Sequence, residues 1–472
     1  MNKPVRTRFA PSPTGMLHIG GVRTALFAYL YAKSNTGSFV LRLEDTDRER
    51  FVENGVEQII KSLDWVGLHP DEGVWYKEKP GQHGPYVQSE RLPHYQKYAK
   101  QLIESGDAYY SCITPEAFIA LREEAIHAKK PFVYKQSMEP SDPPTDTTGS
   151  PIRLKVAAGT TVWRDEIRGE SSTSNELIDD FVILKADGYP TYNFANVVDD
   201  HLMEISHVIR GDEFLSSTAK HAILFDRLGW ERPKWAHAPA ILGPDGNKKL
   251  SKRDGDVDVL EYQTKGYLPE ALLNFLALLG WNDGSEQEIF TKAELIEKFS
   301  LDRVQKSPAV FDIARLDWMN GEYIRKMSAS ELLSSLKPFI PAEWYKDSGY
   351  IEKVAMLDRE RLKTLADARY LMEIFFEEPK IDQVLLSKKD SLEDIKGWLQ
   401  KTVEILENTE FTNEFLEKAL RDLAEELGIK TGQLFYALRI SLTGRTEAPS
   451  LFDIMLVLGK EKSLKRINTV FL

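Results

Sequence analysis

The sequence predicts an α/β fold in the first part of the chain and an all-helical region in its last third. Residues 5–10 and 39–43 are typical of strands, and the apolar residues between them, over residues 20–33, recur at helical spacing. Strand, helix and strand in this order form a βαβ unit. Beyond residue 251 helical spacing dominates, as at residues 362–376, 392–406, 414–427 and 431–442.

The pattern changes at about residue 92, where helical stretches are followed by a run rich in Ser, Pro, Asp and Thr that is typical of a loop or linker. We therefore interpret residues 92–189 as an insertion into the first domain. Residues 190–250 are expected to return to the first sheet. The stretches concerned are helices at 95–105, 115–129 and 217–228, the loop at 137–151, and strands at 152–156, 181–185, 208–209 and 240–242.

Length and composition describe a globular protein of about three domains. The 472 residues are 42% hydrophobic, which excludes a disordered or fibrous chain. Sixty-one Lys and Arg against 73 Asp and Glu give a net charge of −12, so no broad basic surface indicates a polyanion partner, although a local basic groove is compatible with it. Because the sequence has no apolar signal core and no apolar run long enough to cross a bilayer, we expect a cytoplasmic protein with no membrane partner.

The first motif is RFAPSPTGMLHIGG, residues 8–21, in which the first strand leads through a turn into a glycine-led helix. Backbone N–H groups and the dipole at a helix N-terminus favour an anion such as phosphate. Gly20 would let a nucleotide approach the backbone closely. The alternative is an ordinary turn between strand and helix, which a histidine and a glycine alone do not exclude.

The second motif is GPDGNKKLSKR, residues 243–253. Its glycines allow a loop to move, and Lys249 and Lys252 can place positive charge on a triphosphate while negative charge develops there. Taken alone, such a lysine run is more typical of a solvated surface turn. The presence of both motifs in one chain favours a nucleotide site.

Together the two motifs resemble the signature sequences of the class I aminoacyl-tRNA synthetases. More narrowly, the segments RFAPSPTG, LRLEDTDRER, GYPTYNFANVVDDHLMEISHVIRGDE and KKLSKRDGDVDV closely resemble the bacterial type of glutamyl-tRNA synthetase. The resemblance runs from residue 5 to about residue 326 and continues more weakly to the end of the chain. One position departs from the pattern, because Gly21 stands where many class I enzymes have histidine, a change that glutamyl enzymes often tolerate.

The resemblance implies a Rossmann-type class I synthetase catalytic domain with an inserted acceptor-binding domain, followed by an all-helical anticodon-binding region. The implied parts are a catalytic domain at 1–91 and 190–250, an insertion at 92–189 that grips the tRNA acceptor end, a stem-contact domain at 251–326 and an anticodon-binding region at 327–472. The implied reaction activates L-glutamate with ATP and Mg²⁺ and charges tRNA(Glu), in a monomer. Whether tRNA(Gln) is charged as well stays open.

The charges in the first half of the chain suit a glutamate pocket. Free glutamate carries two carboxylates and one ammonium group, so its site needs fixed cations and one carboxylate. Arg8 and Arg210 end two of the predicted strands and supply the cations, and Glu44 follows another strand and supplies the anion. For each of these residues alone, a surface arginine, a cap or a satisfied buried group is the simpler interpretation.

The resemblance assigns the site residues in three groups. The glutamate-binding residues are Arg8, Ala10, Ser12, Glu44, Tyr192, Asn196 and Arg210. The ATP-binding residues are Thr14, His18, Gly20, Gly21, Glu213, Leu242, Lys249, Ser251 and Lys252, with His18, Gly20, Lys249 and Lys252 as the expected catalytic residues. Arg361 falls where an arginine is associated with reading the third anticodon base; the alternative is that it pairs with Asp358 or a nearby glutamate on a solvated helix face.

Other polar residues have simpler interpretations. Some relatives hold zinc through cysteines near the stretch AYYSCIT, residues 108–114, but Cys112 is the single cysteine here, so no structural zinc and no internal disulfide is expected. His69, His83, His94 and His127 lack metal-ligand spacing. The pairs Asp45 with Asp47 and Asp199 with Asp200 are interpreted as caps or structural groups.

Three rival functions are weighed against this interpretation. A related enzyme that glutamylates a modified tRNA base lacks an anticodon-binding module, so the long helical C-terminus argues against it. A catalytically inactive RNA-binding relative is disfavoured because HIGG, KLSKR and the charged pocket residues are all present. A nucleotidyltransferase that shares only the histidine motif is disfavoured by KLSKR and by the expected tRNA-binding parts.

Overall fold

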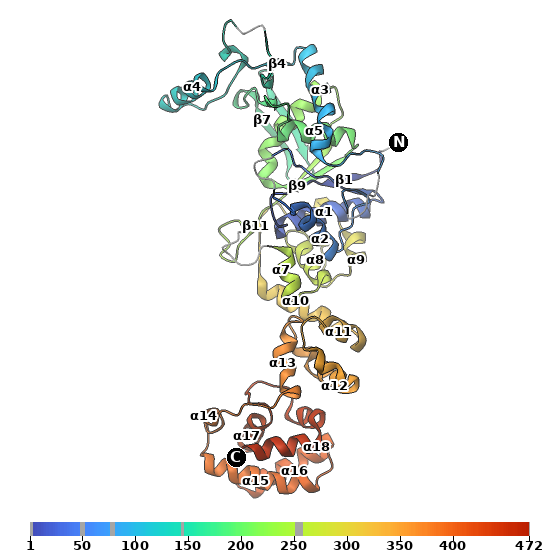
Figure 1. Cartoon of the computed structure of the whole chain (residues 1–472), viewed down its shortest axis with the longest axis vertical. Helices are drawn as coiled ribbons and strands as arrows, with labels where there is room; N and C mark the ends of the chain where they lie inside the picture. Colours follow the sequence, from blue (N-terminus) through green and yellow to red (C-terminus); the bar gives the residue numbers. More distant parts are fainter. Residues whose placement is uncertain (1–2, 48–51, 76–80, 143–145, 251–257, 472) are drawn as a thin grey trace. The chain divides into compact units, whose positions relative to one another are not determined.

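The computed structural model describes residues 3–47, 52–75, 81–142, 146–250 and 258–471 (Figure 1). The chain divides into two compact units. One comprises Met1–Gln263 with Pro269–Ile313, and the other comprises Thr264–Leu268 with Ala314–Leu472. The finer division into four parts that the sequence suggests stays a prediction. Within the described residues, no helix combines the length and the apolar character needed to span a bilayer.

Two sheets form the centre of the first unit. One has the strand order β1-β2-β3 and is parallel throughout. The other has the order β7-β6-β10-β9, in which β6, β10 and β9 are parallel and β7 is antiparallel to β6. The strands are β1 (Arg6–Phe9), β2 (Ser38–Leu41), β3 (Glu72–Gly73), β6 (Thr160–Asp165), β7 (Gly169–Ser174), β9 (His207–Gly211) and β10 (Lys234–Ala238).

The two sheets adjoin at β1 and β9, where the N–H of Ser206 donates to the carbonyl of Arg6 at 3.0 Å. Across this junction the strands follow the order β3-β2-β1-β9-β10, in which the first strand of the chain lies at the centre. This is the doubly wound order, whose usual ligand crevice lies at the carboxyl ends of the two central strands. Arg8 and Arg210 each stand one residue before the end of such a strand.

The predicted βαβ unit is confirmed, because helix α1 (Ile19–Ser34) connects β1 to the parallel strand β2. Val22, Leu26 and Leu30, at helical spacing, are fully buried on this helix. The other helices of this unit are α2 (Gly55–Trp65), α3 (Leu92–Glu104), α4 (Pro115–His127), α5 (Tyr192–Leu202), α6 (Thr218–Arg227), α8 (Pro269–Leu278) and α9 (Lys292–Lys298), and α7 (Val259–Thr264) ends at its boundary.

Residues 92–189, the expected insertion, contribute to two sheets. Strands β4 (Ala108–Tyr110), β5 (Ile152–Leu154) and β8 (Val182–Leu184) form an antiparallel sheet of their own. Strands β6 and β7 instead extend the sheet of β9 and β10, through a parallel contact between Asp165 and Trp235. The segment is therefore continuous with the sheet that carries Arg210.

The turn after β4 is held by a single carboxylate. Glu139 accepts hydrogen bonds from the hydroxyl of Ser111 at 2.5 Å, from the N–H of Cys112 at 2.8 Å and from the N–H of Ile113 at 3.1 Å. This is the stretch where the resemblance associates zinc with some relatives. Among the described residues, no group of three or more His, Cys, Asp or Glu could hold a metal ion.

The second unit is built of helices, as the sequence predicts. The expected helix at 362–376 begins only at Asp367, because the carboxylate of Asp367 accepts from the N–H groups of Lys363 and Thr364 at 3.1 and 2.8 Å and closes a turn instead. The helices are α11 (Ala329–Leu336), α12 (Ser348–Asp358), α13 (Asp367–Phe376), α14 (Gln383–Leu386), α15 (Leu392–Asn408), α16 (Asn413–Glu426), α17 (Thr431–Thr443) and α18 (Leu451–Thr469), after α10 (Ile313–Lys326) at the boundary.

Candidate active site

A cavity of about 1210 Å³ lies at the carboxyl ends of β1 and β9. Most of the residues that the sequence assigns to the site line it: Arg8, Ala10, Ser12, His18, Gly20, Gly21, Glu44, Tyr192, Asn196, Arg210, Glu213 and Lys249. Thr14 and Leu242 are not among its lining residues, although Leu242 forms a β-bridge with Lys249. Ser251 and Lys252 lie outside the described residues.

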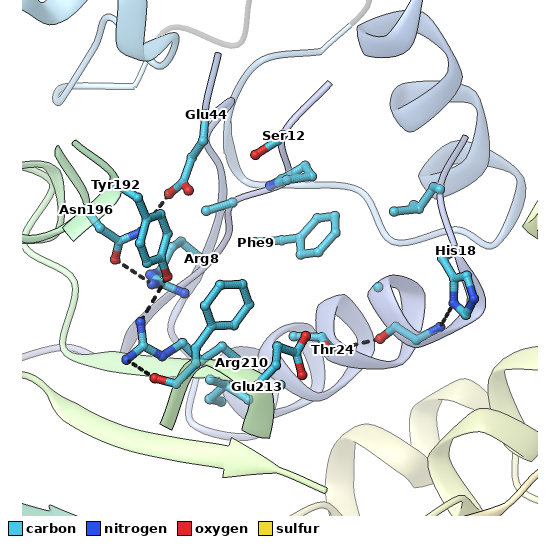
Figure 2. A pocket seen from close by; sticks show the side chains of 18 of the residues that line it. Arg8, Phe9, Ser12, His18, Thr24, Glu44, Tyr192, Asn196, Arg210 and Glu213 are labelled. Carbon is cyan, nitrogen blue, oxygen red and sulfur yellow. Dashed lines mark hydrogen bonds between the residues drawn. The ribbon is translucent and has the colours of Figure 1, made fainter. Parts of the chain in front are cut away.

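The cavity has two chemically different ends. Figure 2 shows Arg8, Glu44, Tyr192 and Asn196 gathered at one end, and His18 at the start of α1 at the other, with Phe9 between them. The first end is rich in buried charge and the second in backbone groups of a helix N-terminus. Two substrates of different chemistry could therefore lie side by side in it.

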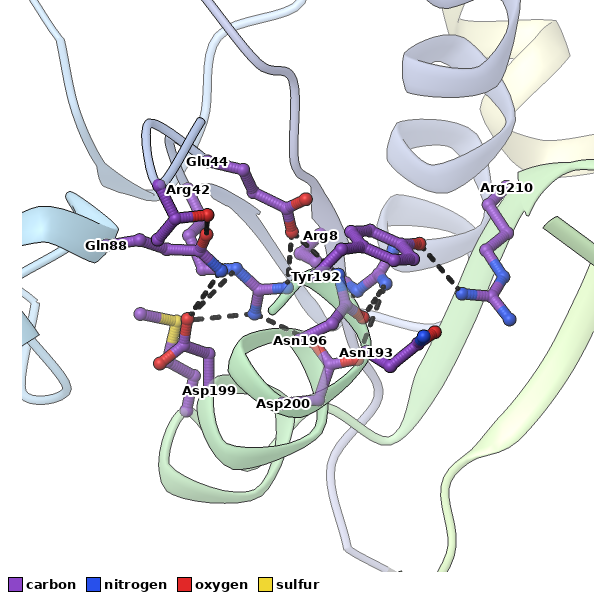
Figure 3. Close-up of polar contacts among 12 residues, drawn as sticks. Arg8, Arg42, Glu44, Gln88, Tyr192, Asn193, Asn196, Asp199, Asp200 and Arg210 are labelled. Carbon is purple, nitrogen blue, oxygen red and sulfur yellow. Dashed lines mark hydrogen bonds and ion pairs between the residues drawn. The ribbon is translucent and has the colours of Figure 1, made fainter. Parts of the chain in front are cut away.

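The charged end rests on a buried ionic network (Figure 3). Arg42, which is fully buried, donates to Asp200 at 2.7 Å and to Glu44 at 3.1 Å. Arg8 donates to the same Asp200 at 3.0 Å. On the far side, Asp199 accepts from Arg91 at 2.6 Å. Within this network the cations Arg8, Arg42 and Arg91 are thus matched by the anions Glu44, Asp199 and Asp200.

Two carboxylates of the network, Asp200 and Glu44, have pKa values shifted in opposite directions. Burial, the largest effect on both groups, favours the neutral acid; at Asp200 the guanidinium groups of Arg8 and Arg42 outweigh it, and the pKa is lowered. At Glu44 burial prevails over Arg42 and Arg8, and the pKa is raised. A further cation, such as a substrate ammonium group, would therefore favour the charged form of Glu44.

In the part of the chain that the structure describes, Arg210 has no carboxylate in direct contact with it. The residue is only 4% exposed. Its guanidinium donates to the hydroxyl of Tyr192 at 3.1 Å, the Nε2 of His237 at 3.0 Å and the hydroxyl of Thr218 at 3.0 Å. Among the described residues no carboxylate lies within ion-pair distance of it. Burial, the largest effect, lowers the pKa of Arg210. Because an unpaired buried charge is costly, this end of the cavity favours an anionic ligand.

The other end of the cavity is organised by His18. Its Nδ1 accepts a hydrogen bond from the N–H of Gly20 at 3.0 Å and so caps helix α1. A Cβ atom placed on Gly20 would meet only that Nδ1, at 3.4 Å, so the protein's own packing tolerates a larger residue there. We infer that glycine at this position keeps the approach to the helix N-terminus open for a ligand.

The lysine-rich loop returns to the cavity at both of its described edges. Lys249 lies 3.4 Å from the carboxylate of Glu213, another residue assigned to the nucleotide. Leu250 lines the cavity, and Asp258 forms a β-bridge with His18. The two sequence motifs are thus neighbours in the fold, which the sequence could only suggest.

Comparisons with known proteins agree with this geometry. Residues 4–318 match the family described as tRNA synthetases class I (E and Q), catalytic domain. The chain belongs to this family. Residues 331–471 match a second family, described as an anticodon binding domain.

Relatives of the family are similar along the whole chain. A glutamate–tRNA ligase of Dehalococcoides mccartyi strain BAV1 is 45% identical over 480 residues, which cover 99% of this chain and 97% of the relative. One from Elusimicrobium minutum is 44% identical over 479 residues and 98% of each chain. The crystal structure of a glutamate tRNA ligase from Elizabethkingia meningosepticum in complex with its amino acid has a TM-score of 0.91 at 37% identity and covers 99% of both chains.

Some residues that shape the synthetase site have no role assigned from the sequence, although Arg42 and Asp200 lie within the motifs that carry the resemblance. Arg42 and Glu44 are two apart after the same strand, and Asn196 and Asp200 are four apart on α5, so strand and helix periodicity could have grouped them. His237 stands in an apolar strand and gives no such signal. Asp45, interpreted as a cap, accepts from the N–H and hydroxyl of Ser89 at 2.8 and 2.6 Å.

Arg361 lies far from this cavity in sequence and belongs to the second unit. Its guanidinium donates to the buried Asp358 at 2.7 Å, the contact expected if it serves as an ion-pair partner. Burial, the largest effect, raises the pKa of Asp358 against the opposing influence of Arg361. The Arg361 side chain keeps 28% of its surface exposed, so a role toward the anticodon stays a prediction.

Proposed function

We propose that this chain is a glutamate–tRNA ligase. It activates L-glutamate with ATP to glutamyl-adenylate and transfers the glutamyl group to the 3′ end of tRNA(Glu). The observation that carries this proposal is the charge of the pocket: a balanced network of three arginines and three carboxylates stands beside Arg210, a buried cation that has only neutral partners. Free glutamate carries a net charge of about −1 at neutral pH. The positive charge of Arg210 and the net negative charge of glutamate are complementary.

In this proposal each charged group of glutamate has a partner. The side-chain carboxylate binds Arg210 together with Tyr192, and the ammonium group binds Glu44, which Asn196 holds through a hydrogen bond of 2.6 Å. Arg8 contributes guanidinium N–H groups to the same wall while Asp200 balances its charge. The α-carboxylate is left to face the nucleotide end of the cavity.

The reaction needs no nucleophilic side chain. An oxygen of the glutamate α-carboxylate attacks the α-phosphorus of ATP, the bond to the β-phosphate oxygen breaks, and pyrophosphate leaves. The 2′-hydroxyl of the terminal tRNA adenosine then attacks the glutamyl carbonyl, loses its proton, and AMP leaves. The protein supplies positioning and charge stabilisation. Mg²⁺ enters as part of the MgATP substrate.

The cap on α1 supports a specific role for His18 toward ATP. Because Nδ1 accepts from Gly20, the neutral imidazole carries its proton on Nε2. His18 would therefore present its Nε2–H as a donor to a phosphate oxygen. Gly20, Gly21 and the lysines of KLSKR complete the proposed triphosphate site.

The match of residues 331–471 to an anticodon binding domain supports this function over a tRNA-modifying glutamylase. Full-length similarity to glutamate–tRNA ligases likewise disfavours a catalytically inactive relative. We further propose a cytoplasmic monomer whose macromolecular partner is tRNA(Glu). The proposal includes the parts assigned to the acceptor end, the stem and the anticodon at 92–189, 251–326 and 327–472.

ATP–pyrophosphate exchange tests the function directly. Exchange should depend on glutamate, and it should be measured with and without tRNA. Aminoacylation of separate tRNA(Glu) and tRNA(Gln) transcripts then decides whether the second tRNA is also charged. Absence of glutamate-dependent exchange under both conditions would reject the proposal.

Removing the charge of Lys252 should lower adenylate formation by about 10²–10³-fold, as expected for one lost preorganised donor on a developing charge. The variant Lys252→Ala should keep its thermal stability and its affinity for tRNA. Pyrophosphate exchange measures the effect. The exposed Lys248→Ala, three residues before the SKR segment, serves as the matched control. Exchange near wild type in Lys252→Ala would refute the assignment.

The proposed anticodon role of Arg361 predicts that Arg361→Gln relaxes the choice between tRNA(Glu) and tRNA(Gln). An arginine fork can donate two hydrogen bonds to one base edge, and an unpaired anticodon base exposes that edge. Aminoacylation of both transcripts measures the preference, and pyrophosphate exchange should be unaffected. An unchanged preference would leave Arg361 as the ion-pair partner of Asp358.

A further inference from the structure

Behind Arg210 lies a buried pair that none of the sequence motifs contains. His237 on β10 is fully buried, and Asp165 at the end of β6 is 1% exposed. The Nδ1 of His237 lies 2.5 Å from a carboxylate oxygen of Asp165, and the Nε2 of His237 lies 3.0 Å from the Nε of Arg210. The three side chains form a continuous chain of hydrogen bonds that ends at the cavity.

The direction of these hydrogen bonds follows from the chemistry of arginine. A guanidinium group can only donate, so the Nε2 of His237 is the acceptor. The imidazole proton then sits on Nδ1 and is donated to Asp165. Burial, the largest effect, lowers the pKa of His237, which keeps the ring neutral beside the cation. The neutral ring therefore has a single tautomer that suits both Asp165 and Arg210, and its Nε2 also lies 3.2 Å from the hydroxyl of Thr218.

The carboxylate of Asp165 is itself fixed in place. Its Oδ1 accepts from the backbone N–H groups of Ile167 and Arg168 at 3.0 and 2.9 Å, in the turn between β6 and β7. Its other oxygen is thereby left for His237. The turn of a β-hairpin thus sets the orientation of an imidazole on the neighbouring strand.

We propose that Asp165 and His237 are positioning residues that hold the Arg210 guanidinium in the orientation that receives the side-chain carboxylate of glutamate. The proposal rests on the assignment of Arg210 to that carboxylate. Asp165 fixes the tautomer of His237, and His237 fixes the plane of the guanidinium through its Nε. Neither residue is among those that line the cavity.

We call the hydrogen-bonded chain from Asp165 through His237 to Arg210 the relay, and the variant Asp165→Asn tests it. The amide nitrogen of Asn can donate to Nδ1, which moves the imidazole proton to Nε2 and turns it toward the Nε–H of Arg210. Two donors then face each other and the guanidinium is displaced. KM for glutamate should rise about 10–100-fold, by analogy with the loss of a hydrogen-bond partner that orients a metal ligand. The KM for ATP should stay at its wild-type value, and kcat should change less than KM.

The variant His237→Gln provides a rescue, because its amide oxygen can accept from Arg210 while its amide nitrogen donates to Asp165. It should keep KM for glutamate close to wild type, whereas His237→Leu should raise it as Asp165→Asn does. Asp180→Asn is the matched control: Asp180 is buried in the same segment and accepts from the N–H of Val156 at 2.9 Å, away from Arg210. Pyrophosphate exchange with saturating tRNA gives the kinetic constants, and thermal unfolding checks the fold.

The outcomes separate the relay from the site it serves. If Arg210→Ala raises KM for glutamate and Asp165→Asn does not, the relay is refuted and the carboxylate site stands. If Arg210→Ala leaves KM for glutamate unchanged, the assignment of Arg210 to the glutamate carboxylate is refuted, and the proposal for Asp165 and His237 is refuted with it. Equal rises of KM for glutamate and ATP in Asp165→Asn, or in the Asp180→Asn control, would show a structural effect and overturn the proposal.

Discussion

Glutamine should be activated on the order of 10⁴-fold less efficiently than glutamate, measured as kcat/KM in pyrophosphate exchange. Glutamine has nearly the shape of glutamate and differs in carrying a neutral amide. With glutamine bound, the buried charge of Arg210 would have no anion in direct contact, and the amide N–H groups would face a donor. The factor corresponds to roughly 5.5 kcal/mol of transition-state binding.

The measurement requires glutamine freed of contaminating glutamate, since even a small trace would mimic activity. An analogue that keeps the charge but not the length, aspartate, serves as a comparison, because it should fail for lack of reach rather than lack of charge. Comparable activation of purified glutamine and glutamate would refute the charge-matched pocket.

Arg210→Ala should lower kcat/KM for glutamate by about 10²–10³-fold, the cost of removing one preorganised charged donor. The main change should be in KM for glutamate, because the lost contact holds the side chain of the substrate and not the reacting carboxylate. KM for ATP should be unaffected, since the residues that we assign to the nucleotide, His18, Gly20 and Lys249, line the other end of the cavity. Exchange kinetics with each substrate varied in turn measure both constants.

Arg153→Ala is the matched control for this variant. Arg153 is also buried, at 8% exposure, and donates to the hydroxyl of Ser111 at 3.1 Å and the carbonyl of Asp180 at 2.8 Å, but it does not line the cavity. Its loss should lower thermal stability and leave KM for glutamate near wild type. A glutamate KM that is the same in both variants would move the carboxylate site elsewhere.

The parts of the fold that the sequence predicts well are those with a strong local pattern. Helix α1 has apolar residues at strict helical spacing, and its connection of β1 to β2 was predictable from their order alone. The hydrophobic pattern does not predict strand β6, because its buried residues are Thr161, Trp163 and Asp165, of which only Trp163 is apolar. The buried position of Asp165 is explained by a tertiary partner, His237, which lies far from it in the sequence.

The candidate site likewise has features that the sequence predicts and features that it does not. Arg8, Glu44 and Arg210 stand at strand ends, where side chains of a doubly wound sheet converge, so their proximity in the cavity follows from the topology. The sequence does not reveal that Arg8 is already balanced by Asp200 while Arg210 is not. That difference depends on which face of α5 packs against β1, a tertiary contact that no local pattern encodes.

The hairpin of β6 and β7 limits how freely this protein can exchange parts with its relatives. Cuts at residues 92 and 189, the expected limits of the insertion, would transplant Asp165 from one parent while His237 came from the other. A chimera of that kind would inherit its amino-acid selectivity from both parents at once. Recombination that respects the sheet would instead leave β6 and β7 with the strands they extend, and move only the antiparallel sheet of β4, β5 and β8 with its helices.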